Sequence, residues 1–357
     1  MSNSFSVSSK VRGLYHVHFI EDIKKSLVTI TKENNLIFII DEKVSILFKE
    51  ELSIISSNCR HILIKSSEGN KTINYTQEVI RELIKVDVRK DDTLIAIGGG
   101  ITQDIVTFIA SILFRGLEWK FYPTSLLAQC DSCIGSKSSI NFDQYKNLLG
   151  TFNPPSEIFI YAGFLNTLSE SEIRSGIGEM LHYYFTEGIS LAQEVSDKFY
   201  ELLTNRNILL YFISNSLRIK KNIIEIDEFD TSIRHIFNYG HTFGHALEAI
   251  TDYSIPHGQA ISLGMDLANY ISLQKQMISK VQFDEMHAIL VKNIPSFTFT
   301  KNNLDCYINA LTKDKKNKGN KLGCILTYGA GKVEKVFVDI DENLRKLILD
   351  YSQSYTN

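Results

Sequence analysis

The sequence predicts an α/β domain with a doubly wound, mainly parallel sheet, followed by a mainly α-helical domain. Short β-rich runs alternate with helical patterns in the first half of the 357 residues, and three glycines directly follow one of these runs. Helical periodicity dominates after about residue 166. Because alternating strands and helices favour right-handed crossovers, the first half predicts a parallel sheet. We therefore expect two domains, at residues 1–165 and 166–357.

The elements follow from apolar runs and their spacing. Buried strands are expected in the first half at Asn35–Ile40, His61–Ile64, Thr93–Ile97 and Trp119–Tyr122, with a helix at Asp104–Leu113. Helices are expected in the second half at Glu170–Tyr183, Ala192–Leu203, Ile208–Ile224 and Thr242–Ile250. We find no internal repeat and no low-complexity segment.

Composition excludes several classes of protein. The chain is 44% hydrophobic and 22% charged with a net charge of −3, which argues against a general nucleic-acid surface. No apolar stretch approaches a membrane span, and the polar start lacks the apolar core of a secretory signal. Five scattered cysteines fit a reduced cytoplasm. Cys130 and Cys133 form a C-x-x-C, for which buried packing is favoured over metal or redox use.

A glycine-rich turn, Gly98-Gly99-Gly100, lies between a predicted strand and a predicted helix. Glycines there let the backbone approach a pyrophosphate, and the helix amino end offers free N–H groups, as in Rossmann-like domains. A tight turn without a ligand is the alternative. Asp41 ends an earlier strand, where an acid can bind a ribose hydroxyl or cap a helix.

Histidines near residue 250 predict a metal site. His241 and His245 lie four residues apart on one helix face, and His257 follows a loop with Pro256. Glu179 lies in an upstream helix. One carboxylate with two imidazoles and an open position is typical of catalytic zinc. The spacing does not decide which two histidines bind the metal.

Basic residues in otherwise apolar contexts predict an anion pocket, although a solvated surface is the usual place for a single lysine. These residues are Arg115, Lys137, Lys146, Lys220, Arg234, Lys315 and Lys316.

Motifs along most of the chain resemble one family. IGGGITQD, FRG, PTSLLAQCDSCIGSK, KNLLGTF, GEM, RHIFNYGHTFGHALEA, HGQA and DKK occur in the order and spacing of 3-dehydroquinate synthases. The resemblance extends from about Asp41 to Lys316. On these motifs the chain is identified as a member of the sugar-phosphate cyclase superfamily, which implies the dehydroquinate synthase-like fold.

The resemblance implies a role for each matching residue. Zinc, or alternatively Co²⁺, would be held by Glu179, His241 and His257, with His245 beside the substrate phosphate. NAD would be held by Asp41, Glu68, Lys71, Gly99, Gly100, Asp104, Thr124, Ser125 and Lys146, with Phe164 and Thr167 nearby. Substrate would be held by Asp131, Lys137, Asn147, Lys220, Arg234, Asn238 and Lys316. Arg115 would reach the phosphate site of a neighbouring subunit, which implies a homodimer.

The reaction implied is the conversion of an open-chain keto-acid sugar phosphate into a carbocycle, within the shikimate pathway of aromatic amino acid biosynthesis. NAD takes a hydride and later returns it, phosphate leaves by β-elimination, and an aldol step closes the ring. The enzyme is thus expected to be a carbon–oxygen lyase that needs NAD only in catalytic amounts.

The chain departs from the family pattern at four positions, of which three bear on the substrate: His182, Ser136 and Gln259. The four departures are His182 in place of a lysine, Ser136 in G-S-K, Gln259 in H-G-Q, and Lys43 in place of an asparagine. The lysine normally contacts substrate hydroxyls, and a histidine is a shorter and more weakly charged donor. We therefore expect His182 to line the substrate pocket and the preferred substrate to differ from the usual one, or to react slowly.

Three alternatives remain. A related cyclase would act on sedoheptulose 7-phosphate or glucose 6-phosphate, although Lys220, Arg234 and Asn238 favour a keto acid. A metal-dependent alcohol dehydrogenase of the glycerol dehydrogenase type would release NADH and would not need the basic cluster. A non-catalytic binding protein would not need the ligand set at Glu179.

Overall fold

The computed structural model describes residues 4–143, 145–314 and 316–355, in two compact units. Unit 1 comprises Met1–Leu168 and Lys220–Asp230, and unit 2 comprises Ser169–Ile219 and Thr231–Asn357. Unit 1 contains a mainly parallel sheet of seven strands, whereas unit 2 is mainly helical. The predicted fold class is therefore confirmed.

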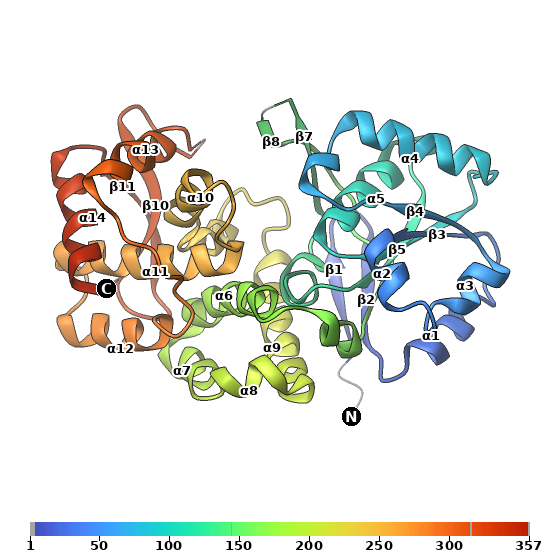
Figure 1. Cartoon of the computed structure of the whole chain (residues 1–357), viewed down its shortest axis with the longest axis horizontal. Coiled ribbons are helices and arrows are strands. Elements are labelled where there is room, and N and C mark those ends of the chain that lie inside the picture. The colour runs from blue at the N-terminus through green and yellow to red at the C-terminus, as the bar shows by residue number, and fades with distance from the viewer. Residues whose placement is uncertain (1–3, 144, 315, 356–357) are drawn as a thin grey trace. The chain divides into compact units, whose positions relative to one another are not determined.

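The sheet of unit 1 has the strand order β1-β2-β9-β6-β5-β3-β4, and only β1 and β2 are antiparallel neighbours (Figure 1). Its strands are β1 Phe5–Ser9, β2 Gly13–Phe19, β3 Leu36–Asp41, β4 Arg60–Ile64, β5 Thr93–Gly98, β6 Glu118–Pro123 and β9 Glu157–Ile160. The four apolar runs that were predicted to be strands form β3, β4, β5 and β6, in that order. The β1-β2 hairpin at one edge was not predicted, because its short strands carry a weak apolar pattern.

Helices cover both faces of this sheet (Figure 1). One face packs against α1 Ile23–Ile30, α2 Glu42–Leu47 and α3 Ser53–Asn58 in a shared core. The other is covered by α4 Ile73–Lys85 and α5 Gly100–Ile112. Because both faces are covered, β3 and β5 are buried over nearly their whole length, which explains their continuous apolar sequence.

The rest of unit 1 consists of short elements that carry polar side chains. A second hairpin is formed by β7 Lys137–Phe142 and β8 Tyr145–Phe152. Short helical turns are η1 Glu68–Asn70, η2 Leu113–Arg115, η3 Ala128–Ser132 and η4 Ala162–Thr167, of which η3 is a π-helix. Single-turn π-helices often mark functional sites.

Unit 2 is built from helices and one hairpin, β10 Lys321–Thr327 with β11 Val333–Asp339. Its helices are α6 Glu170–Glu187, α7 Ile189–Asp197, α8 Phe199–Thr204, most of α9 Arg206–Ile224, α10 His241–Ile250, α11 His257–Gln274, α12 Lys280–Leu290, α13 Lys301–Thr312 and α14 Glu342–Tyr355, with the turn η5 Ile233–Asn238. The end of α9, from Lys220 on, belongs to unit 1. The single helix expected at Ala192–Leu203 is divided into α7 and α8 at Lys198, whose backbone leaves the helical region. None of the helices in the described part of the chain has the length and apolar composition needed to cross a membrane.

Candidate active site

Glycines bring α6 and α11 into backbone contact beside the predicted metal ligands. A Cβ atom added to Gly258 would lie 1.7 Å from Ser175 O, and one added to Gly178 would lie 1.9 Å from Gly258 O. Any larger side chain would therefore separate the two helices. This close approach places Glu179, on α6, next to His257, the first residue of α11.

Two distances match the spacing of ligands around one metal ion. Glu179 Oε1 lies 3.5 Å from His241 Nε2, and Glu179 Oε2 lies 3.4 Å from His257 Nε2. Atoms that bind a tetrahedral zinc ion at about 2.1 Å are separated by about 3.4 Å. Among the described residues the buried Oε2 atom has no hydrogen-bond partner, which is expected where a cation binds. The three groups therefore fit a divalent metal.

The charge of Glu179 suits this role. Burial opposes ionisation, but the charges of His182 and His241 hold the pKa of this carboxyl well below its usual range. Glu179 is thus a carboxylate, which is the form that binds a metal.

Outer contacts orient both imidazoles. His257 Nδ1 lies 3.1 Å from Glu248 Oε2, and His241 Nδ1 lies 3.2 Å from the Tyr239 main-chain oxygen. Because each partner is an acceptor, the Nδ1 atoms carry protons and the Nε2 atoms are directed to the metal position. Burial alone would lower the pKa of His257, but Glu179 and Glu248 raise it to about 10, so a metal ion would have to displace its Nε2 proton.

His245 remains a possible third imidazole of this cluster. Ligand atoms of His241, His245 and His257 lie within 4.8 Å of one another, a spacing that a metal ion could bridge. The His245 side chain is exposed, yet the protein around its ring and the charges of His241, His257 and Lys316 lower its pKa. It is therefore a neutral imidazole that can bind either metal or substrate. The expectation that His245 stays outside bonding distance remains a prediction.

Basic and amide groups of the substrate set lie on the same unit. Lys316 Nζ donates to Asn238 Oδ1 at 3.3 Å and lies 3.5 Å from Asp314 Oδ2. Arg234 is buried. A small pocket is lined by His235, Asn238, Thr242, Lys316, Gly323, Cys324, Ile325 and Lys335. Lys315 lies outside the described residues.

In unit 1 the glycine turn forms the expected strand–turn–helix. Gly99 is the N-cap of α5, and no side chain caps this helix. A Cβ atom on Gly99 would lie 3.3 Å from Ser125 Oγ, while Thr124 N donates to Gly98 O at 2.9 Å. The turn therefore presents main-chain N–H groups beside the Ser125 hydroxyl, an arrangement that suits a phosphate.

A buried ion pair continues this surface. Lys71 Nζ donates to Asp104 Oδ2 at 2.7 Å, and Ser139 N donates to Asp104 Oδ1 at 2.8 Å. Burial raises the pKa of Asp104, although Lys71 opposes this shift. The Ser139 hydroxyl also donates to Asn147 Oδ1 at 2.9 Å, so the hairpin strands β7 and β8 join predicted cofactor and substrate residues.

Asn141 connects two further predicted residues. Its amide donates to Glu68 Oε1 at 2.8 Å, and its oxygen accepts from Asn147 N at 2.9 Å. Lys146 Nζ lies 3.8 Å from the same Glu68 oxygen. The contacts thus bring Glu68 next to Lys146 and Asn147, although more than seventy residues of the chain separate them.

Two lysines of the predicted substrate set are paired with acids. Lys220 Nζ, which is buried, donates to both the main-chain oxygen and Oδ1 of Asp131 at 2.7 Å. Lys137 Nζ donates to Asp230 Oδ2 at 2.6 Å. Asp131 lies in the π-helix η3, which turns its carboxylate towards Lys220.

Comparison with known proteins decides the family. The profile of the 3-dehydroquinate synthase N-terminal domain matches residues 61–175, and that of the C-terminal domain matches residues 176–317. A 3-dehydroquinate synthase of Thermoanaerobacter sp. (strain X514) is 31% identical over 343 residues, covering 93% of this chain and 96% of the relative. The chain belongs to the 3-dehydroquinate synthase family. The predicted family and its enzyme class, a phosphate-eliminating cyclase, are therefore confirmed.

Solved structures of sugar-phosphate cyclases share the fold. A 2-deoxy-scyllo-inosose synthase bound to carbaglucose-6-phosphate, NAD⁺ and Co²⁺ is 21% identical with a TM-score of 0.83, covering 97% of this chain and 99% of that one. A 2-epi-5-epi-valiolone synthase of Streptomyces hygroscopicus subsp. jinggangensis 5008, bound to NAD⁺ and Zn²⁺, is 22% identical with a TM-score of 0.83, covering 98% and 99%. Both of these neighbours bind NAD⁺ and a divalent metal, the cofactors that the sequence predicts for this chain.

Two residues that the 3-dehydroquinate synthase motifs associate with NAD have strong structural roles. Asp41 caps α2 by accepting from Lys43 N at 2.8 Å, so the helix-cap alternative applies whether or not a ribose binds. The Phe164 side chain is fully buried against Phe48, with ring centroids 4.9 Å apart. Only its main chain could contact a cofactor. Thr167 donates its hydroxyl back to the Phe164 main-chain oxygen.

Other motif residues have unusual settings. Phe114 and Arg115 both have left-handed backbone angles, with φ of 53° and 68°, and Phe114 is exposed. Such strain in two successive residues is costly and favours a functional role.

Cys130 and Cys133 are buried and donate to main-chain oxygens within the helical turn, and burial raises the pKa of Cys133 to about 12. These settings fit packing rather than redox chemistry.

His182 has a different setting from the one expected of a residue that lines the substrate pocket. Its side chain is 1% exposed, and Nδ1 lies 3.5 Å from Glu179 Oε1. Substrate contact by this ring remains a prediction. A ring buried to this extent has almost no surface with which a substrate could make direct contact.

Sequence reasoning missed four residues of these networks: Ser139, Asn141, Asp230 and Glu248. Glu248 is in the motif GHALEA and lies seven residues after His241 on the same helix, so helical spacing was an available signal. Asp230 pairs with a lysine 93 residues away, and no local pattern could have found it.

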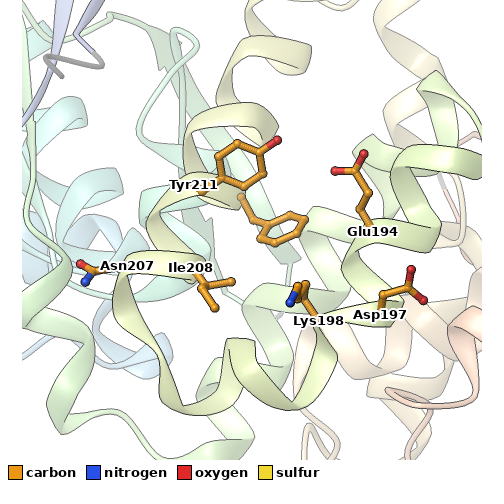
Figure 2. A pocket seen from close by; sticks show the side chains of 7 residues that line it. Glu194, Asp197, Lys198, Asn207, Ile208 and Tyr211 are labelled. Carbon is orange, nitrogen blue, oxygen red and sulfur yellow. The ribbon is translucent and has the colours of Figure 1, made fainter.

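A pocket of about 480 Å³ lies between α7 and the first turns of α9 (Figure 2). It is lined by Glu194, Asp197, Lys198, Asn207, Ile208, Tyr211 and Phe212. It contains none of the predicted site residues, and its lining has neither the metal-ligand set nor the anion-binding groups described above. Its size therefore does not make it the active site.

Proposed function

We propose that this chain catalyses the 3-dehydroquinate synthase reaction, in which an open-chain seven-carbon keto-acid sugar phosphate becomes a carbocycle and releases phosphate. The observation that carries the proposal is the Glu179–His241–His257 cluster, whose donor atoms have the spacing of metal ligands. The family's relatives at about 31% identity are named for this reaction. We assign zinc as the metal, with Co²⁺ as a substitute.

Each part of the chain has a proposed task. Residues 1–165 would bind NAD through the glycine turn and the Lys71–Asp104 pair. Residues 166–357 would bind the metal, with Arg234, Asn238 and Lys316 for the anionic ends of the substrate. When bound, the metal acidifies the substrate hydroxyl that it contacts, and NAD accepts and returns the hydride.

The side chains would mainly bind and orient the substrate. Lys137 and Lys220 are held by Asp230 and Asp131, so their ammonium groups have defined positions for an anion. Glu248 holds His257 in the tautomer that binds a metal. His245, as a neutral imidazole, can exchange a proton with the substrate phosphate.

Phosphate release with catalytic NAD is the first expected result. The metal-loaded protein, given the keto-acid heptulosonate phosphate and far less NAD than substrate, should release one phosphate per substrate while absorbance at the NADH band returns to baseline. The reason is that the hydride goes back to the molecule it came from. Stoichiometric accumulation of NADH would instead show an alcohol dehydrogenase.

A related cyclase is the second candidate, and the absence of a lysine at position 182 favours it. The same assay with sedoheptulose 7-phosphate and glucose 6-phosphate separates the two candidates. If only sedoheptulose 7-phosphate releases phosphate, the protein is a cyclase of that substrate. If none does while the protein binds NAD and metal, a non-catalytic binding role is the remaining alternative.

We also assign the protein as a cytoplasmic homodimer in which Arg115 completes the partner's phosphate site. Arg115→Ala and Glu179→Gln should each be inactive, whereas a re-equilibrated mixture should recover activity. Half of the dimers would then be mixed, each with one intact site of two, so about a quarter of wild-type activity is expected. A mixture as inactive as its components, despite subunit exchange shown by native mass spectrometry, would place Arg115 in its own subunit's site.

A further inference from the structure

The side chain of His182 touches two of the three proposed metal ligands. Its Nδ1 atom lies 3.5 Å from Glu179 Oε1, and its ring meets the His241 ring edge-on, with centroids 5.3 Å apart at 86°. The His182 ring therefore contacts both the Glu179 carboxylate and the His241 imidazole.

Two aromatic rings also pack against His182. The Tyr183 ring centroid is 3.9 Å away, and that of Phe237 is 5.8 Å away. Tyr183 and Phe237 also pack edge-to-face on each other at 4.6 Å. With a side chain only 1% exposed, His182 is held in one place and offers almost no surface to a small molecule.

From these contacts we infer that His182 is a positioning residue of the metal site, which fixes the Glu179 carboxylate and the His241 ring, and is not a substrate contact. The inference rests on the proposed metal-dependent function. Metal affinity depends on ligands being held close to their bound geometry, and losing an outer contact typically weakens binding by about 10–100-fold. A flexible lysine would not supply the same fixed support, because its four-carbon stem has many rotamers.

The burial of His182 also affects how the substrate is bound, because the family's lysine at this position contacts substrate hydroxyls. A buried imidazole cannot donate to a substrate hydroxyl as an extended lysine does. The departure at position 182 thus removes one substrate contact and adds one support to the metal ligands. Substrate recognition then depends on the remaining polar groups, such as Arg234 and Asn238.

The test is metal affinity, measured on metal-free protein by competition with a chromophoric chelator for Zn²⁺. His182→Ala should weaken binding by about 10–100-fold, as should the positive control Glu248→Ala, which removes the His257 contact. The Co²⁺ absorption spectrum should change with the altered ligand geometry. In steady-state assays kcat at subsaturating metal should fall, while KM for the substrate should change little.

Two further variants separate metal positioning from folding and from substrate binding. His287→Gln removes a histidine–carboxylate bond of the same unit, from His287 Nδ1 to Asp266 Oδ2 at 2.8 Å, and should lower stability without changing metal affinity. His182→Gln keeps a polar side chain of similar size should His182→Ala fail to fold. His182→Lys should weaken metal binding if the inference is right, and should improve substrate KM at unchanged metal affinity if His182 is a substrate contact.

The result that overturns the inference is wild-type metal affinity in His182→Ala, or in His182→Gln if the alanine variant does not fold. Failure of the proposed function is distinguishable, because wild-type protein would then bind no divalent metal at the cluster. A wild-type protein that binds metal but releases no phosphate would leave the role of His182 standing and remove only the cyclase assignment.

Discussion

Glu179→Gln is expected to abolish tight binding of a divalent metal and to reduce phosphate release by about 1,000-fold or more, since a metal stabilises transition-state charge by several kcal/mol. The substituted amide is neutral and presents a weaker oxygen ligand. Glu179 is also the group that contacts both His241 and His257, so its loss removes the centre of the cluster. No other residue of the cluster supplies a negative charge directly between the two imidazoles.

Metal binding can be read without activity. Zn²⁺ should raise the melting temperature of the wild-type protein, because a ligand that binds only the folded state stabilises it, and should leave that of Glu179→Gln unchanged. Glu187→Gln is the matched control, since it removes the same charge from the exposed end of the same helix. Wild-type metal affinity in Glu179→Gln would contradict the ligand assignment. His245→Ala would then be expected to lose the metal, which would identify the three-histidine set.

Lys220→Met is expected to destabilise the protein by about 3–5 kcal/mol, the usual cost of removing one partner of a buried ion pair. The ammonium group donates to two oxygens of Asp131, and its side chain is 6% exposed. Its loss takes the Lys220 ammonium away from the Asp131 carboxylate, which is itself only 19% exposed. The measurement is the midpoint of urea unfolding, together with phosphate release under native conditions.

The neighbouring lysine provides the control for this prediction. Lys221, on the same helix, pairs at 2.9 Å with Glu225 just beyond the helix end, but both side chains are about a quarter exposed. Lys221→Met should therefore cost no more than about 1 kcal/mol. The double variant Asp131→Asn, Lys220→Met should recover part of the lost stability, because it removes both charges of the pair. Equal unfolding midpoints for the two lysine variants would refute the buried-pair argument.

The sequence predicted the parts of this protein that depend on local pattern. The runs that became β3 and β5 are apolar throughout because helices cover both faces of the sheet, and a strand of this kind can be recognised from the chain alone. The glycine turn and the spacing of His241 and His257 are equally local. The type of ligand set, one carboxylate with two imidazoles, suggested Glu179, and the family resemblance then selected His241 and His257 as its partners.

Tertiary structure decided the contacts between distant residues. Asn141 bridges Glu68 and Asn147, and Asp230 holds Lys137, because hairpins and loops return to places that no local periodicity specifies. The edge hairpin β1-β2 was missed for a related reason: its short strands obtain their stability from pairing with each other and with β9.

His182 shows the division most clearly. Its distance of three residues from Glu179 correctly placed both side chains on one face of α6, since that follows from helical geometry alone. Whether that face meets solvent or protein depends on what packs against it. Phe237 and His241 come from distant parts of the chain and close over the ring, so burial, and with it the role of the residue, was decided only when the helices packed together.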